Sequence, residues 1–247
     1  MSHNEYMDKK IILGLTTTCG SHWRGKIKEI DELGVKEVSL FPTCLSLAQR
    51  REMYNLLEKT GLESIPHVHL RSDDMETWEL DFLCDRYKTR VFNMHPCLES
   101  YKFIQNNPKY REKIFIENFF LESHKKEFTR DCLKKHNIAG ICLDFSHLAT
   151  EKELCDEDYK RTCEIINLYP IGCNHISGFE SGFLKKLFKL GEKISLHRCR
   201  DNSQLDYLKQ FPASYFSPYL SIELENSFAE QLEFKKYIEE ILKTIAG

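Results

Sequence analysis

The sequence lacks the long apolar runs and polybasic blocks that would point to a membrane or to nucleic acid. The apolar stretch near its start, 11–15, is too short for a bilayer span or the core of a signal peptide. The 35 Lys and Arg against 38 Asp and Glu give a net charge of −3, so the overall field does not favour anionic partners. We therefore expect no membrane partner, and nucleic acid is the less favoured ligand.

Paired cysteine motifs, glycine-rich phosphate turns and linkers are also missing. Ten cysteines are scattered without a CxxC pair, which favours reduced thiols in a cytoplasmic protein. Neither GxGxxG nor GxxxxGK[ST] occurs, so a nucleotide-binding open sheet has no support. Because no Pro/Gly/Ser-rich linker interrupts the chain, we expect one domain over residues 1–247.

What the sequence does contain is eight short apolar, β-branched or aromatic runs that alternate with amphipathic stretches. The runs cover residues 11–16, 35–41, 64–70, 90–96, 113–119, 138–147, 171–179 and 219–226. This alternation predicts strands followed by helices and hence a parallel sheet. The last interval is the longest and holds an additional segment, 192–201, which we expect to be an insertion or a long loop.

Eight such units in about 250 residues are the number and size of a TIM barrel. We therefore predict an α/β fold, a single-domain (β/α)8 barrel. The C-terminal stretch 234–245 carries Phe234, Ile238 and Leu242 every four residues, so it should pack as a helix on the outside of the barrel.

Ionisable side chains stand at the end of every predicted strand from the third onward. Because the carboxyl ends of barrel strands meet at one mouth, these side chains should share one site. In chain order they are His67, His69, His95, Glu117, Asp144, His147, His175, His197 (in the long last interval) and Glu223.

A cluster of carboxylates and imidazoles is most readily held together by a cation, because like charges repel unless they are protonated or neutralised. Imidazole and carboxylate ligands suit Mn, Zn, Co or Fe(II) rather than Ca. Cys142 and Cys173 each lie two residues before a proposed ligand, and we interpret them as core filling.

Several short motifs resemble the xylose isomerase-like TIM barrels, a superfamily that includes sugar-phosphate isomerases, epimerases and endonuclease IV. They are GICLDFSH (140–147), IFIENF (114–119), NMHP (93–96) and LSIELEN (220–226). The resemblance implies that Glu117, Asp144, His175 and Glu223 bind one divalent ion.

The endonuclease branch of this superfamily adds histidines from strands three and four and an Asp-x-His pair. Here His69, His95 and His197 match the additions and would form a second metal site, but Ser195 stands where the aspartate should be. If His69 and His95 bind a second ion, Glu117 should bridge the two ions about 3.5–4 Å apart, a geometry that favours hydrolysis.

The preferred function is a divalent-metal-dependent isomerase or epimerase of a sugar or sugar phosphate. Glu117 and Glu223 would be the bases that remove the proton beside a metal-bound carbonyl, and His147 would hydrogen-bond the substrate. Candidate substrate-binding residues are His67, Arg71, Arg198 and Arg200, the arginines as forks for a phosphate or carboxylate.

Two alternatives remain open. The first is a zinc-dependent phosphodiesterase acting on abasic DNA, supported by the additional histidines and opposed by the net charge of −3. The second is a barrel without catalytic activity, opposed by the retention of the ligand set at six strand ends.

Overall fold

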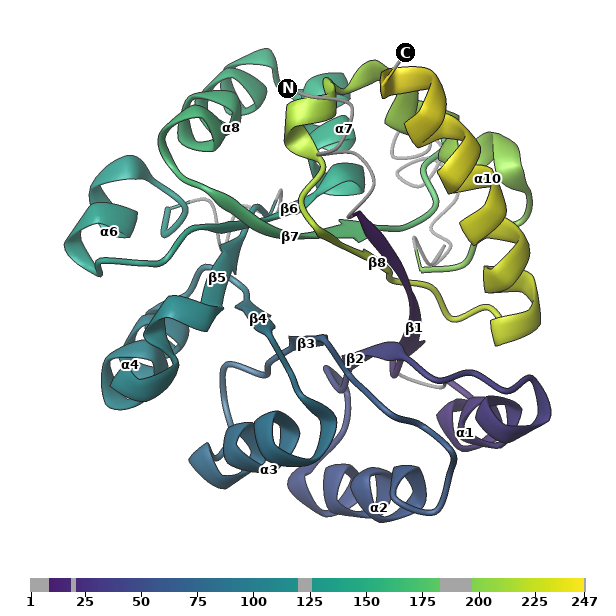
Figure 1. Cartoon of the computed structure of the whole chain (residues 1–247). Helices are drawn as coiled ribbons and strands as arrows, with labels where there is room; N and C mark the ends of the chain where they lie inside the picture. Colours follow the sequence, from purple (N-terminus) through teal and green to yellow (C-terminus); the bar gives the residue numbers. More distant parts are fainter. Residues whose placement is uncertain (1–8, 19–20, 120–125, 183–196, 247) are drawn as a thin grey trace.

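The computed structural model describes residues 9–18, 21–119, 126–182 and 197–246, and it is a closed parallel barrel (Figure 1). The strands follow one another around the ring in chain order, and β8 pairs with β1 to close it. They are β1 Lys10–Thr16, β2 Val38–Phe41, β3 His67–His69, β4 Val91–Met94, β5 Ile114–Glu117, β6 Ile141–Asp144, β7 Ile171–Ile176 and β8 Tyr219–Ile222. The predicted (β/α)8 fold is confirmed.

Helices surround the strands on the outside of the ring (Figure 1). The α-helices are α1 Trp23–Glu32, α2 Leu47–Leu57, α3 Thr77–Tyr87, α4 Leu98–Asn106, α6 Arg130–Lys135, α7 Phe145–Leu154, α8 Asp156–Leu168 and α10 Phe228–Ala246. Short 3-10 helices are η1 Pro108–Lys113, η2 Asn202–Gln210 and η3 Ala213–Tyr215, so part of the long last interval is helical. Each strand is thus flanked by elements that cover its outer face.

Except for β1, the strands are shorter than the apolar runs predicted. The prediction extended β6 to residue 147, whereas the strand ends at Asp144 and α7 begins at the next residue. The reason is a cap: Asp144 Oδ1 accepts a hydrogen bond from the backbone N–H of His147 at 2.8 Å, which starts the helix. Asp144 therefore ends a strand and begins a helix, and this places it at the rim of the barrel.

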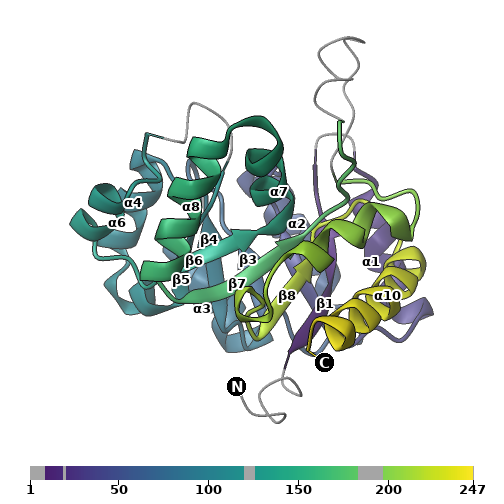
Figure 2. The ribbon, with the colours of Figure 1, turned by 90° about the horizontal axis from the view of Figure 1, so that it is seen from above.

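The C-terminal helix α10 packs against β1 and α1, as Figure 2 shows. Phe234, Ile238 and Leu242 are all buried in this contact, so the prediction for this helix is confirmed. Helix burial of this kind stabilises the ring because the apolar outer faces of the strands are removed from water.

At two glycines any other residue would either clash with a neighbouring strand or strain the backbone. A Cβ on Gly14 would lie 1.8 Å from the carbonyl oxygen of Ile222, so Gly14 lets β1 and β8 close the barrel. Gly34 follows the end of α1 with φ of +65°, the left-handed conformation that commonly ends helices.

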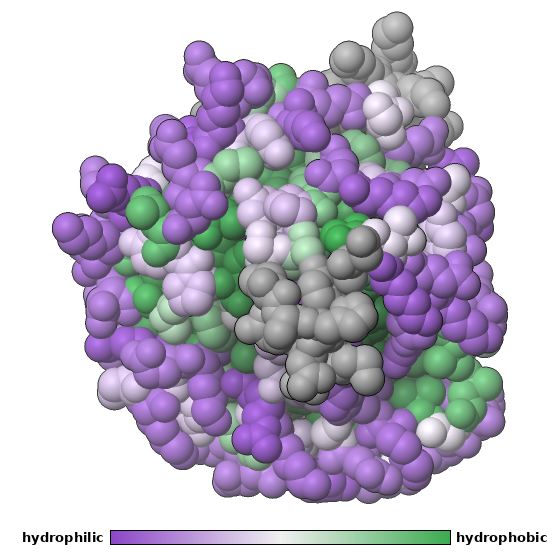
Figure 3. All heavy atoms as spheres, turned by 45° about the horizontal axis from the view of Figure 1, so that its top comes forward, coloured by the Kyte–Doolittle hydropathy of each residue, from purple (hydrophilic) through white to green (hydrophobic). Residues whose placement is uncertain are grey.

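Hydrophilic side chains cover most of the face in Figure 3, and hydrophobic residues gather in smaller groups between them. Within the described residues, no helix combines the length and the apolar character that crossing a bilayer requires. All cysteines in the described ranges are free thiols.

Candidate metal centre

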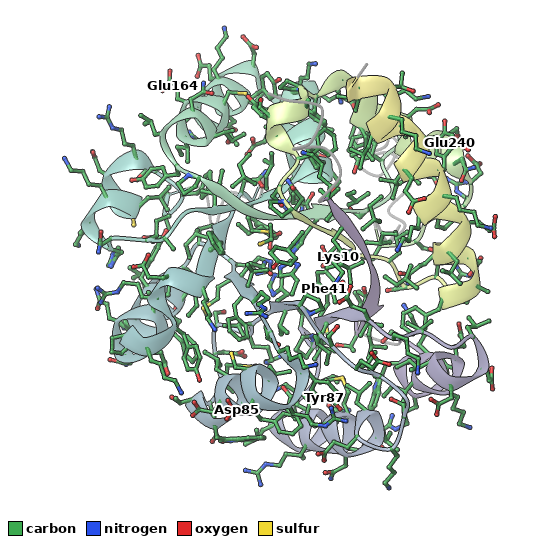
Figure 4. The ribbon with its side chains drawn as sticks, in the orientation of Figure 1. Lys10, Phe41, Asp85, Tyr87, Glu164 and Glu240 are labelled. Carbon is green, nitrogen blue, oxygen red and sulfur yellow. The ribbon has the colours of Figure 1, made fainter. Side chains whose placement is uncertain are left out.

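Alternation along the strands places two layers of polar side chains inside the barrel. Residues two apart on a strand face the same side, so His67 and His69 of β3 both point inward, as do Cys142 and Asp144 of β6 and Cys173 and His175 of β7. The layer nearer the carboxyl ends holds carboxylates and imidazoles. Figure 4 shows Phe41 inside the ring, whereas Glu164 and Glu240 lie on outer helices.

His175 lies at the middle of the upper layer. Its Nδ1 atom is 3.3 Å from Glu223 Oε2, 3.4 Å from Glu117 Oε2 and 3.8 Å from Asp144 Oδ2. All four side chains are buried, although they come from four different strand ends. The structure therefore brings together the four residues that the sequence predicted as ligands of one ion.

A second group of ligand atoms shares Glu117 with the first. His69 Nε2 lies 3.1 Å from Glu117 Oε2 and 3.2 Å from His95 Nε2. The ligand atoms of these three residues all lie within 4.8 Å of one another, as do those of Asp144, His175 and Glu223. The same Glu117 oxygen thus lies between His69 and His175.

Asn93 connects the two groups, although it was not among the residues predicted from the sequence. Its Nδ2 donates to Glu117 Oε2 at 2.7 Å, and its Oδ1 accepts from His175 Nε2 at 3.3 Å and from His67 Nε2 at 2.9 Å. The available signal was its position two residues before His95, which puts Asn93 on the inward face of β4 and His95 on the same side just after the strand ends. Asn93 fixes the orientation of three side chains at once.

Asp144 is also held by its neighbours. Its Oδ1 accepts from Ser146 Oγ at 2.7 Å, and the Asn118 side chain bonds to its backbone N–H and C=O groups. His147 lies beside it, with Nδ1 donating to the carbonyl oxygen of Asn118 at 2.9 Å. The second carboxylate oxygen, Asp144 Oδ2, is buried and accepts no hydrogen bond from the described residues.

The electrostatics of the cluster are those of crowded carboxylates with imidazoles between them. Burial lowers the pKa of His175, but Glu117 and Glu223 raise it well above its ordinary value. Burial raises the pKa of Glu117, and His175 and His69 lower it well below its usual range. Burial raises the pKa of Glu223 as well, and His197 and His175 bring it to about 2. The imidazoles beside Glu117 and Glu223 thus favour the ionised forms of these two carboxylates over what burial alone would allow.

These residues fit a divalent cation. His175 Nε2 donates to Asn93, so in a neutral His175 ring Nδ1 carries the lone pair. This lone pair faces three carboxylates, and the contact is repulsive unless a cation or a proton lies between Nδ1 and the carboxylate oxygens. Burial and His69 lower the pKa of His95 to about 3, so His95 is neutral and able to act as a ligand. The uncoordinated Asp144 Oδ2 supplies one more acceptor for the same cation.

The remaining predicted residues lie at different distances from this cluster. His197 Nδ1 is 3.8 Å from Glu223 Oε1 and its side chain is one-third exposed, while Ser195 lies outside the described residues. His67 is one layer deeper and fully buried. It is therefore placed below the mouth rather than at it.

The three predicted arginines are not gathered at the cluster as a fork. Arg71 Nε bonds to Asp74 and its Nη2 to Asp73, each at 2.6 Å. Arg200 pairs with Glu180 at 2.8 Å, and Arg198 is exposed. Their substrate-binding role stays a prediction, and Arg71 must release its acidic neighbours to fulfil it.

Aromatic rings form the walls around the cluster. The Phe41 ring centroid is 5.1 Å from that of His175, and the Phe119 centroid is 4.5 Å from that of His95 and 4.8 Å from that of His147. Apolar walls lower the local dielectric constant and strengthen the interactions of the ions within.

Comparison with known proteins identifies the fold. No protein-family model matches the chain, and no curated protein matches it. Among the solved structures that match is a xylose isomerase domain-containing protein from Salmonella typhimurium, with a TM-score of 0.51, 14% identity and coverage of 97% of this chain and 98% of that one. The likeness shows that this chain shares the (β/α)8 barrel fold of that protein over nearly the whole length of both chains.

Proposed function

We propose that the chain is a divalent-metal-dependent hydrolase of phosphate esters. One observation carries the proposal: Glu117 Oε2 lies 3.1 Å from His69 Nε2 and 3.4 Å from His175 Nδ1. A carboxylate between two ligand groups is suited to two ions, one held by Asp144, His175 and Glu223 and the other by His69 and His95. This arrangement favours phosphodiester hydrolysis, the alternative to the isomerase that the sequence led us to prefer.

When bound, two divalent ions supply Lewis acidity for displacement at phosphorus. The protein's own residues hold the reacting groups. Asn93 fixes Glu117 and His175 through its side-chain hydrogen bonds. The hydrogen bond of His147 to the Asn118 carbonyl fixes the His147 ring beside Glu117, with His147 Nδ1 3.5 Å from Glu117 Oε1. His147 is thus the candidate to give a proton to the leaving oxygen.

The test is hydrolysis of a simple phosphodiester, bis(p-nitrophenyl) phosphate, and of duplex DNA with one abasic site, each in Zn²⁺ and in Mn²⁺. We expect turnover to be lost when His69→Ala is combined with His95→Ala. The control is His22→Ala, which removes an exposed histidine at the start of α1 that belongs to neither ligand group. Turnover that survives the double substitution contradicts the two-ion proposal.

The second candidate is the sugar isomerase or epimerase. The likeness to a xylose isomerase domain-containing protein over nearly the whole of both chains supports it, as does the net charge of −3, which disfavours polyanionic substrates. In this reaction Glu117 and Glu223 would exchange the proton beside a carbonyl, and one ion would be enough.

The two candidates are separated by a panel of ketoses and ketose phosphates assayed with the same variants. Isomerisation that survives His69→Ala with His95→Ala but is lost in Glu223→Gln supports the second candidate and contradicts the first. Glu117→Gln should abolish activity in either case, because it removes a ligand and a base together.

A further inference from the structure

The lower layer of the barrel interior contains a second set of metal-ligating side chains. His67, Cys142 and Cys173 lie two residues before His69, Asp144 and His175 and face the same side of their strands. All three side chains are fully buried. The lower layer therefore repeats the pattern of the upper one, with two thiols in place of carboxylate and imidazole.

The three side chains are close enough to bind one ion. Cys142 and Cys173 are direct register partners on β6 and β7, and both are free thiols. One ligand atom from each cysteine and one from His67 all lie within 4.8 Å of one another. Three strands thus converge on one point below the upper cluster.

These residue types are unusual at such positions. Interior layers of TIM barrels are ordinarily filled by Val, Ile and Leu. Here the two thiols pack with Val91, Phe115 and Tyr219, in a cluster separate from the main hydrophobic core. Thiols and an imidazole in an apolar layer of this kind are the donor set that thiophilic ions prefer.

The hydrogen bonds of His67 orient it as a ligand. Asn93 Nδ2 donates to Glu117, so Asn93 Oδ1 faces the His67 ring and accepts from Nε2. Nδ1 is then the unprotonated nitrogen, and it accepts from Ser221 Oγ at 2.6 Å. Metal-binding histidines usually donate their other ring N–H to an oxygen in this way, and the Ser221 hydroxyl can rotate to free Nδ1.

We propose that Cys142 Sγ, Cys173 Sγ and His67 Nδ1 form a separate binding site for a thiophilic ion, Zn²⁺ in particular. When Zn²⁺ binds, the two thiols release their protons to solvent. The two thiolates then neutralise the charge of the Zn²⁺ ion, and a neutral site is the one that an apolar layer can bury at low cost. Two cysteines and one histidine are a known zinc ligand set. The site is independent of the reaction proposed above.

The experiment uses Co²⁺ as a spectroscopic substitute for zinc in the full-length protein. Thiolate ligands give a charge-transfer band in the near ultraviolet that carboxylate and imidazole ligands do not give. We expect this band in the wild type and its loss in Cys142→Val with Cys173→Val, together with one equivalent less of bound zinc. Valine is an ordinary filler of barrel layers, so this variant should fold.

Three further variants make the result specific. Cys132→Val with Cys163→Val removes two half-buried thiols elsewhere and should leave the band intact. Glu223→Gln alters only the upper cluster and should also keep the band. His67→Gln should weaken zinc binding while the band persists at high Co²⁺.

The outcomes separate this site from the upper one. A wild type without a thiolate band overturns the proposal, as does a band that survives the double valine variant. A band that depends on Cys142 but not on Cys173 also overturns it. The Cys142 thiol also lies within 4.8 Å of ligand atoms of Glu117 and His175, so it would then be a ligand of the upper ion. If the valine variant does not fold, Cys142→Ser and Cys173→Ser, singly, give the same test with side chains of similar size.

Discussion

Two buried charged clusters in this protein differ in whether their charges are balanced. Between α2 and α3, Arg50 donates from Nε to Glu79 Oε2 at 2.8 Å and from Nη2 to Glu79 Oε1 at 2.9 Å, and Tyr54 donates to the same carboxylate. Arg50 and Glu79 are both fully buried. This cluster is complete: each charge has its counter-charge and each donor its acceptor.

The upper layer of the barrel is different, because three carboxylates face imidazoles rather than arginine or lysine. Glu117, Asp144 and Glu223 surround His175 Nδ1, and Asp144 Oδ2 accepts no hydrogen bond from the described residues. A buried cluster that its own side chains do not neutralise is a candidate for a ligand. The first cluster is therefore structural, and the second is the candidate binding site.

The largest effect should come from breaking the balanced cluster. Arg50→Met leaves Glu79 buried without a counter-charge, with only the Tyr54 hydroxyl and the Glu76 backbone N–H still donating to it, so we expect a loss of about 3–5 kcal/mol in the free energy of unfolding. Urea denaturation followed by circular dichroism measures it. Arg24→Met, which removes an exposed ion pair with Glu52, is the control and should change stability far less. Equal losses of stability in the two variants would show that the burial of Arg50 does not increase the cost of breaking its ion pair.

The next effect comes from filling the unbalanced cluster. At a Zn²⁺ or Mn²⁺ concentration 100 times the Kd, binding should stabilise the native wild type by about 2.7 kcal/mol. Thermal unfolding with and without the ion measures this, in metal-depleted protein. Glu117→Gln should lose most of the stabilisation, whereas Arg50→Lys should keep it. A wild type whose unfolding does not respond to either ion contradicts the binding role.

The smallest effect concerns Glu151 on α7. This buried carboxyl belongs neither to the Arg50–Glu79 cluster nor to the candidate metal ligands. Burial raises its pKa to about 7, and its Oε2 atom has no hydrogen-bond partner among the described residues. Because this pKa is higher than in the unfolded chain, the native state is favoured at low pH, and the stability falls as pH rises from about 4.5 to 7.

Glu151→Gln removes this penalty. We expect the variant to be more stable than the wild type by about 1–3 kcal/mol at pH 8 and not at pH 4.5, since one pKa unit corresponds to about 1.4 kcal/mol. Urea denaturation at the two pH values checks it. A stability difference that is the same at both values would mean that Glu151 does not titrate near 7 in the native state.

Particular residues show how far the site could be predicted from the sequence. His69, His95, Glu117, Asp144 and His175 were found because strand ends in a barrel must meet. Asn93 was missed because a single amide inside an apolar run gives no signal of its own. Only the packing of β3, β4 and β7 reveals that Asn93 contacts His67, His175 and Glu117.

Strand limits were the least predictable part of the fold. The run 138–147 is apolar enough to be a strand throughout, but the chain turns into α7 after Asp144. An aspartate can serve as a strand-end ligand or as a helix cap, and here Asp144 Oδ1 caps the helix while Oδ2 stays available to the proposed ion. Local propensity does not resolve such a double role.

The sequence by itself determined the number of strands, their parallel arrangement and the inward face of each, because alternation along a strand and the order of elements are local properties. Tertiary structure alone decided which inward residues lie at the same height. That depends on the stagger of a closed barrel, which brings His67 and Ser221 together across 154 residues of chain. For the same reason, only the folded barrel places Glu117 between His69 and His175, the contact on which the proposed chemistry depends.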